Sequence, residues 1–326
     1  MSKYHIALIT DDNYCLPTLV CIKSIINHCS ESYNYIIHVC TLGLEEANIT
    51  KFQELSTANV SVVVDLFNGV LYEEKTKYIS QKTHVTPTAL IKFELPNYYS
   101  CLDKLLYLDG DIIIKDNIDE LLKLDISNYY VAASYEFWAY LAAVRYTFRG
   151  KFSFYFNSGV MLLNLKKMRD NNISDLLWDY KLHHTKTKLM DQESLNAVCG
   201  KNAYPLSIKW NFNPVFLDHQ YLSHINRIYG SGYGTLNKLE NDVCIIHYVG
   251  KSDKPWIYRN ASLRKYWDAC YISLKGVEQI NLVDYIPPKR TAIAKLIAKI
   301  KQYGFIGTFL FFMFRLKNCI SNNYKR

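Results

Sequence analysis

Short runs of β-branched and apolar residues alternate with segments of helical spacing over the first third of this chain. This alternation is typical of crossover units, in which helices connect the strands of a mostly parallel sheet. The expected strands cover residues 5–10, 36–41, 60–66 and 104–108, and a further apolar run covers residues 112–114. The expected helices follow Pro17, begin at Glu45 and cover residues 88–95. The sequence therefore predicts an α/β fold with helices flanking a mostly parallel central sheet.

The remainder of the chain has a less regular pattern. It predicts strands at residues 130–134, 160–165 and 243–248, and helices at residues 174–180 and 192–199. Pro287-Pro288 is the clear boundary, since the residue before a proline avoids the helical conformation and two prolines stiffen the joint. We predict a catalytic domain at residues 1–286 and a tail at residues 287–326.

The predicted tail carries nine basic residues and no acidic ones, whereas residues 1–286 carry 29 basic and 30 acidic residues. Ile293, Leu296, Ile297 and Ile300 share one helical face. A neutral body with a basic amphipathic tail favours contact with anionic membrane lipid over nucleic acid. The alternative is a C-terminal helix that packs on the domain.

The sequence also favours a cytoplasmic location, peripheral on the cytoplasmic face of the inner or plasma membrane. The apolar run at residues 5–10 is too short for a secretory signal, and the run at residues 305–314 is too short for a spanning helix, which needs about 20 residues. The nine cysteines are odd in number and lack a C-x-x-C pair, which argues against a disulfide framework and a structural zinc site.

The loop after the first strand reads Thr10-Asp11-Asp12-Asn13-Tyr14 and has no glycine. Dinucleotide-binding folds place a glycine-rich loop there, so this loop argues against a dehydrogenase or a P-loop protein. A bound diphosphate would need another source of positive charge.

Asp109-Gly110-Asp111 lies between two apolar runs. Residues i and i+2 share one side of a strand, so both carboxylates can chelate one hard cation. The alternative is a turn with solvated acids. His247 ends another apolar strand, where it is either a hydrogen-bonded core histidine or a third ligand; with the carboxylates it would suit Mn²⁺. Lys254-Pro255-Trp256 offers a cation for a phosphate, or is a packed turn.

Five motifs occur together and in order, and with them the chain resembles the retaining glycosyltransferases of family 8 over about residues 4–268. The motifs are Thr10–Tyr14, Lys104–Asp111, Tyr155–Val160, Asp191–Asn196, and His247–Gly250 with Lys254-Pro255-Trp256. The similarity is greatest to the bacterial lipopolysaccharide α-galactosyltransferases and α-glucosyltransferases. The resemblance implies a GT-A fold and a UDP-sugar donor.

The resemblance also implies roles for individual residues. Asp109 and Asp111, the family's Asp-x-Asp motif, and His247 would hold Mn²⁺, or Mg²⁺, against the UDP diphosphate. The implied nucleotide-sugar contacts are Thr10, Asp11, Asn13, His84, Asp109, Gly110, Gly250 and Lys254. Those implied at the donor sugar are Asn157, Asp191, Gln192, Glu136 and Lys92.

The expectation is more specific at three of these positions. Gln192 occupies the position debated as nucleophile or transition-state stabiliser, and an amide is a poor nucleophile. Lys92 replaces the arginine that the family usually has, which keeps the charge but loses the planar fork that pairs bidentately. Asp191 has an alternative role as the cap of the following helix.

The function that this resemblance implies is transfer of galactose or glucose from a UDP-sugar to a lipopolysaccharide, lipooligosaccharide or related glycan in α-linkage. One alternative is a metal-dependent sugar nucleotidyltransferase, although the glycine-rich first loop of such enzymes is missing. Another is a membrane-docked glycan-binding module with a structural metal.

Overall fold

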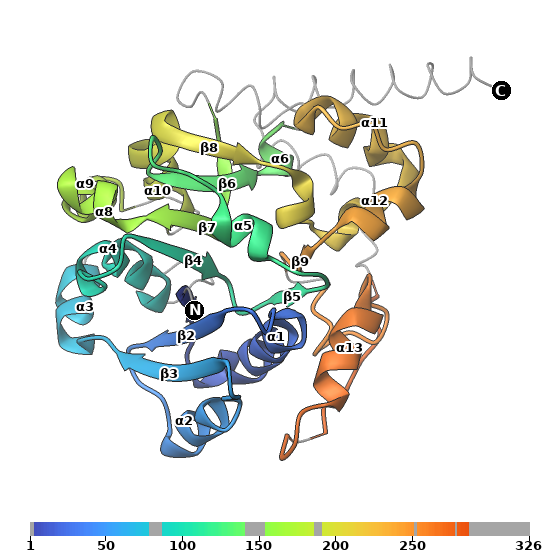
Figure 1. The fold of residues 1–326 in the computed structure, drawn as a ribbon, viewed down its shortest axis with the longest axis horizontal. Helices are drawn as coiled ribbons and strands as arrows, with labels where there is room; N and C mark the ends of the chain where they lie inside the picture. Colours follow the sequence, from blue (N-terminus) through green and yellow to red (C-terminus); the bar gives the residue numbers. More distant parts are fainter. Residues whose placement is uncertain are drawn as a thin grey trace.

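A seven-stranded sheet with the order β3-β2-β1-β4-β7-β6-β8 forms the centre of the protein (Figure 1). The computed structural model describes residues 3–77, 87–140, 154–185, 191–250, 253–277 and 279–286. The strands of this sheet are β1 Lys3–Ile9, β2 Asn34–Thr41, β3 Val60–Leu66, β4 Lys104–Leu108, β6 Val131–Tyr135, β7 Phe156–Asn164 and β8 Ala203–Leu206. Four of its six pairings are parallel, and β7 is antiparallel to both of its neighbours. The predicted mostly parallel sheet is confirmed.

Alternation along β1 explains why both faces of the sheet are buried. Ile6 and Leu8 point into one apolar cluster, whereas Ala7 and Ile9 point into the other. The first cluster includes residues of α1 Cys15–His28, α2 Glu46–Gln53 and α5 Asp119–Lys123. The second includes residues of α3 Gly69–Thr76, the 3₁₀ helix η2 Pro87–Phe93, α4 Leu95–Tyr98, α8 Leu165–Asp170, α9 Ile173–His183 and α10 Gln192–Cys199. The helices therefore flank the sheet on both faces.

A second, two-stranded sheet joins β5 Ile112–Ile114 to β9 Ile245–His247. A third apolar cluster contains Ile113 and Ile246 of this sheet and residues of α11 His219–Tyr229, α12 Leu236–Asp242 and α13 Arg264–Ile272. The short helices α6 Phe137–Tyr140, η1 Asp12–Tyr14, η3 Gly200–Asn202, η4 Ile208–Trp210 and η5 Pro214–Phe216 complete the described elements. In Figure 1, α13 lies near α1 at the lower right, and α11 and α12 lie above α13.

Two expected elements differ from the structure in ways that affect the site. Strand β7 begins at Phe156 rather than at residue 160, because the polar and small residues Asn157, Ser158 and Gly159 resemble a loop in sequence although they continue the strand. The helix expected at residues 88–95 is the 3₁₀ helix η2 followed by the separate helix α4. Pro96 lies in the first turn of α4, where a proline needs no donor N–H.

The predicted tail at residues 287–326 and the Pro287-Pro288 boundary lie outside the described residues. Among the helices that the structure describes, none combines the length and the apolar character that crossing a bilayer requires. The eight cysteines in the described ranges are all free thiols, as their spacing predicts.

Candidate active site

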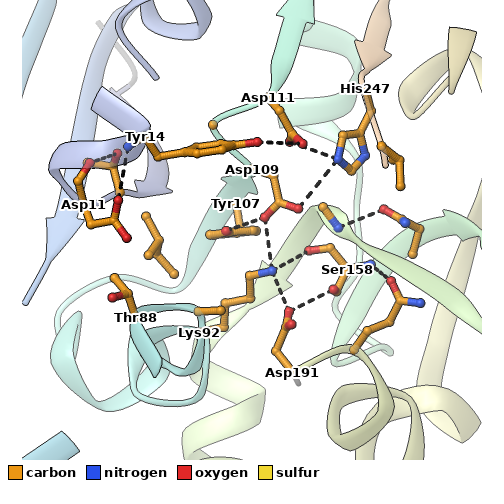
Figure 2. A pocket seen from close by; sticks show the side chains of 18 of the residues that line it. Asp11, Tyr14, Thr88, Lys92, Tyr107, Asp109, Asp111, Ser158, Asp191 and His247 are labelled. Carbon is orange, nitrogen blue, oxygen red and sulfur yellow. Dashed lines mark hydrogen bonds and ion pairs between the residues drawn. The ribbon is translucent and has the colours of Figure 1, made fainter. Parts of the chain in front are cut away.

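A cavity of about 500 Å³ opens where β1 and β4 end (Figure 2). Most of the residues singled out from the sequence line it. They are Thr10, Asp11, Lys92, Asp109, Gly110, Asp111, Asn157, Asp191, Gln192, His247, Gly250 and Lys254. Ligands in open α/β sheets bind outside the carboxyl ends of the strands, and the cavity has that position.

Asp109, Gly110 and Asp111 connect β4 to β5, so the apolar strands on either side hold the two carboxylates in place. His247 joins them because β9 pairs with β5 in a register that places His247 opposite Ile112. His247 Nε2 lies 3.1 Å from Asp111 Oδ1 and 3.7 Å from Asp109 Oδ2. One ligand atom from each residue lies within 4.8 Å of the other two. This set can hold a divalent cation.

The backbone around this set fits such a role. A Cβ atom on Gly159 would lie 2.1 Å from His247 Cε1 and 2.8 Å from Asp109 Oδ2, so a side chain at this position would displace the ligand set. Two carboxylates and an imidazole suit a hard or borderline cation such as Mn²⁺. The residues present therefore fit a divalent cation such as the Mn²⁺ or Mg²⁺ that the resemblance implies.

Lys254 and Tyr14 contact the outer side of Asp111. Lys254 Nζ lies 2.5 Å from Asp111 Oδ2, and the Tyr14 hydroxyl donates to the same oxygen at 3.1 Å. Burial alone raises the pKa of Asp111, but the charges of Lys254 and His247 outweigh burial and hold it well below its usual range. Asp111 is therefore ionised, as a metal ligand must be.

Lys92 is the central cation on the other side of the cavity. It is 4% exposed, and its Nζ lies 2.6 Å from Asp191 Oδ2 and 3.1 Å from Asp109 Oδ1. It also donates to the Ser158 carbonyl at 3.3 Å. Burial lowers the pKa of Lys92, but the charges of Asp109 and Asp191 outweigh burial and raise it above its ordinary value. Lys92 thus remains charged and links the Asp-x-Asp motif to Asp191 at the N-terminus of α10.

Asp191 lies at the N-terminus of α10, yet its side chain makes no capping hydrogen bond in the described structure. Its Oδ2 instead accepts from the Ser158 hydroxyl at 2.9 Å and pairs with Lys92. The capping role considered from sequence is wrong.

Gln192 and Asn157 meet at the carboxylate of Glu136. Asn157 Nδ2 donates to Glu136 Oε2 at 2.8 Å, and Gln192 Nε2 lies 3.4 Å from the same oxygen. Gln192 Oε1 accepts from the Ser158 backbone N–H at 3.1 Å. Glu136 is not one of the described residues that line the main cavity, but with Asn157 it lines a smaller one of about 20 Å³.

The structure brings only some of the residues predicted to contact the nucleotide to the cavity. The Asp11 carboxylate accepts from the Tyr14 backbone N–H at 3.1 Å and lines the cavity. Asn13 is exposed on η1 and is not one of the residues that line the cavity in the described structure. His84 lies outside the described residues. Gly250 has a φ of 94°, a conformation that favours glycine.

Sequence reasoning missed five polar residues of this region. Tyr107 donates its hydroxyl to Asp109 Oδ1 at 2.6 Å, and two-residue alternation along β4 could have indicated it. The others are Tyr14, Thr88, Ser158 and Asn211. Tyr14 and Ser158 lie within the quoted motifs, whereas Thr88 and Asn211 have no local sequence signal.

Comparisons with known proteins agree with this geometry. The model of the family described as "Glycosyl transferase family 8" matches residues 5–260. The chain is 27% identical over 256 residues to a lipopolysaccharide 1,2-glucosyltransferase of Escherichia coli, a match that covers 76% of this chain and 71% of that protein. It is 26% identical over 265 residues to a lipopolysaccharide 1,3-galactosyltransferase of Salmonella typhimurium, over 78% and 73% of the two chains.

A crystal structure of the galactosyltransferase LgtC with donor and acceptor sugar analogs superposes with a TM-score of 0.66 at 23% identity. The match covers 84% of this chain and 98% of that one. At this identity the similarity shows the fold alone, and the predicted GT-A fold is confirmed.

Proposed function

The chain belongs to glycosyl transferase family 8, and we propose that it transfers galactose or glucose from a UDP-hexose to a glycan acceptor with retention of the α configuration. The observation that carries this proposal is the proximity of two groups in one cavity. The Asp109–Asp111–His247 set lies on one side, and the buried Lys92–Asp191 pair lies beside it. The first group suits a metal-bound diphosphate, and the second suits the sugar attached to it.

In this proposal, some residues act on the leaving group and others act on the sugar. Bound to Asp109, Asp111 and His247, Mn²⁺ would supply a Lewis acid that stabilises the charge of the departing diphosphate. Lys254 lies beside Asp111 and adds a donor for the same phosphate oxygens. The metal and Lys254 would thereby supply the positive charge that a diphosphate needs when the glycine-rich loop is missing.

On the sugar side, the residue at the position debated as nucleophile is an amide whose oxygen already accepts a hydrogen bond. The Gln192 carbonyl accepts from the Ser158 N–H, and the Asp191 carboxylate is held by Lys92 and the Ser158 hydroxyl. These contacts support front-face attack by the acceptor hydroxyl as UDP departs. Gln192, Asp191, Asn157 and Glu136 orient the sugar and stabilise its developing positive charge.

The acceptor in this proposal is a lipopolysaccharide, a lipooligosaccharide or a related glycan. The two relatives named above transfer different hexoses, glucose in one case and galactose in the other. Lys92 contributes charge without the bidentate fork of an arginine, so the choice between the two donors depends on the whole sugar pocket.

We place the enzyme at the cytoplasmic face of the membrane through residues 287–326, whose nine basic residues and lack of acidic ones suit anionic lipid. Residues 1–286 form the catalytic domain in this proposal. A membrane location would bring the active site close to a glycolipid acceptor.

The test is UDP release from UDP-glucose and UDP-galactose with Mn²⁺ and without acceptor. A transferase hydrolyses its donor slowly under these conditions, and the Asp109→Asn variant is the control. A nucleotidyltransferase would instead form UDP-sugar from UTP and a sugar phosphate, and a glycan-binding module would release no UDP. Either of these results contradicts the proposal.

A further inference from the structure

Two consecutive backbone N–H groups of β7 donate to side-chain amides in the site. The Ser158 N–H donates to Gln192 Oε1 at 3.1 Å, and the Gly159 N–H donates to Asn157 Oδ1 at 3.0 Å. A backbone N–H can only donate, so the amide atom that it meets must be oxygen. The orientations of Gln192 and Asn157 are therefore fixed by the main chain.

The orientation of Asn157 determines that of Asn211. Asn157 Oδ1 lies 2.9 Å from a terminal atom of Asn211, and since an oxygen only accepts, that atom must be the Asn211 NH₂ group. The Asn211 carbonyl oxygen then lies 2.9 Å from His247 Nδ1. This oxygen also only accepts, so His247 Nδ1 carries hydrogen. In the neutral imidazole the lone pair is then on Nε2, the atom that faces Asp109 and Asp111.

The backbone holds Asn211 in place for this contact. Phe212, the next residue, donates its N–H to the Ile245 carbonyl at 2.9 Å, and the Phe212 carbonyl accepts from the His247 N–H at 2.9 Å. Asn211 and His247 are 9% and 3% exposed, so water has little access to compete for their hydrogen bond. The pairing between this segment and β9 therefore places the two side chains in contact.

We propose that Asn211 is a positioning residue that sets the tautomer and the ring orientation of His247 for metal binding. Through Asn157 and Glu136 it also connects the metal set to the residues assigned to the sugar. The inference rests on the proposed function, because it takes His247 to be a metal ligand. Hydrogen-bonding partners of ligating histidines fix the ring in this way, and their loss costs about 10- to 100-fold in metal affinity.

The two hydrogen bonds of Asn211 can be separated by substitution. Asn211→Leu removes both, and we expect Mn²⁺ affinity to fall by about 10- to 100-fold. Asn211→Asp keeps an acceptor for His247 Nδ1–H but places a second oxygen against Asn157 Oδ1. We expect its Mn²⁺ affinity to stay near or above that of the parent protein, while its rate of UDP release falls.

Asn213→Ala is the matched control. Asn213 lies in the same segment and has the same 9% exposure as Asn211, but its side chain accepts from the Val215 N–H at 3.2 Å. Mn²⁺ affinity, measured from the electron paramagnetic resonance signal of free Mn²⁺, should be unchanged in this variant. Thermal unfolding of all three variants verifies that they are folded. Equal loss of Mn²⁺ affinity in Asn211→Asp and Asn211→Leu, or parental affinity in a folded Asn211→Leu, would overturn the inference.

A second measurement needs no metal and tests the inference separately. In ¹⁵N-histidine-labelled metal-free protein, His247 Nδ1 should carry hydrogen, because the carbonyl oxygen of Asn211 faces it at 2.9 Å. The His247→Gln variant identifies its signals. A His247 Nδ1 without hydrogen in the parent protein overturns the inference, even if no variant folds. A parent protein whose His247 Nδ1 carries hydrogen but which binds no Mn²⁺ supports the positioning by Asn211 and contradicts the metal site of the proposed function.

Discussion

The ammonium group of Lys92 lies 2.6 Å from the carboxylate of Asp191, although 99 positions separate the two residues in the chain. The same ammonium group lies 3.1 Å from Asp109. One buried cation thus pairs with two carboxylates that belong to different parts of the proposed site, one in the metal set and one beside the sugar.

Removal of this cation should damage both stability and activity. Lys92→Met leaves Asp191 and Asp109 without their partner, and breaking a buried ion pair costs about 3–5 kcal/mol. We expect a lower free energy of unfolding in urea and a large loss of UDP release. Lys92→Arg keeps the charge, so it should retain much of both.

Lys166→Met is the control for Lys92→Met, because Lys166 forms an exposed pair with Asp170 at 2.7 Å. Exposed pairs contribute about 0–1 kcal/mol. If Lys92→Met unfolds at the same urea concentration as Lys166→Met, the structural role given to Lys92 is wrong.

Activity should require a divalent cation, with Mn²⁺ the most effective. Asp109→Asn, Asp111→Asn and His247→Ala should each lower turnover by at least about 10²-fold, since each removes a ligand of the main electrostatic stabiliser. Chelation should abolish UDP release, and added Mn²⁺ should restore it. Full turnover in excess EDTA would contradict the metal assignment.

Gln192→Ala should lower turnover and leave the affinity for UDP nearly unchanged, because the proposed partner of Gln192 is the reacting sugar. Binding of UDP is measured by titration calorimetry, and turnover by UDP release. The product should be an α-glycoside. A β-linkage in its NMR spectrum would refute the retaining mechanism.

The tail should be needed for membrane binding and dispensable for chemistry. We choose truncation after Ile286, because Tyr285 is held by two hydrogen bonds with Asn260. The truncated protein should hydrolyse UDP-hexose yet fail to sediment with anionic vesicles. Each Lys or Arg near the lipid contributes about 1 kcal/mol, and salt screens this attraction, so binding of the full chain should weaken as salt is added. If the full chain does not sediment with such vesicles at low salt, or the truncated chain misfolds, a packed C-terminal helix explains the sequence better.

A pH effect on stability is expected at Asp65, away from the site. Burial raises the pKa of Asp65, but hydrogen bonds from His38 and Tyr99 outweigh burial and lower it. A lowered folded-state pKa stabilises the protein above the unfolded value of about 3.9, and this contribution is lost as the pH falls through the folded value. Between about pH 6 and pH 3, the unfolding free energy of the parent should fall more than that of Asp65→Asn. If the unfolding free energies of the two proteins fall equally over this pH range, Asp65 does not have this role.

The sequence by itself determined the features that depend on local periodicity. The spacing of apolar residues predicted the bounds of β3, β4 and α10, as well as the mostly parallel sheet. The apolar runs around Asp109-Gly110-Asp111 also placed two carboxylates at the end of a central strand. Side chains two residues apart share one face of a strand, so a few neighbouring residues suffice to predict this pair of carboxylates.

Tertiary structure alone decided which distant side chains meet. The pairing of β5 with β9 brings His247 to the carboxylates, and the strand conformation of Asn157-Ser158-Gly159 turns two backbone N–H groups towards the amides of the site. Asn211 has no signal in its own neighbourhood, because its role comes from a segment that pairs with β9 through Phe212. Such contacts depend on the register between strands and on how the layers pack, and periodicity within a single segment carries no information about either.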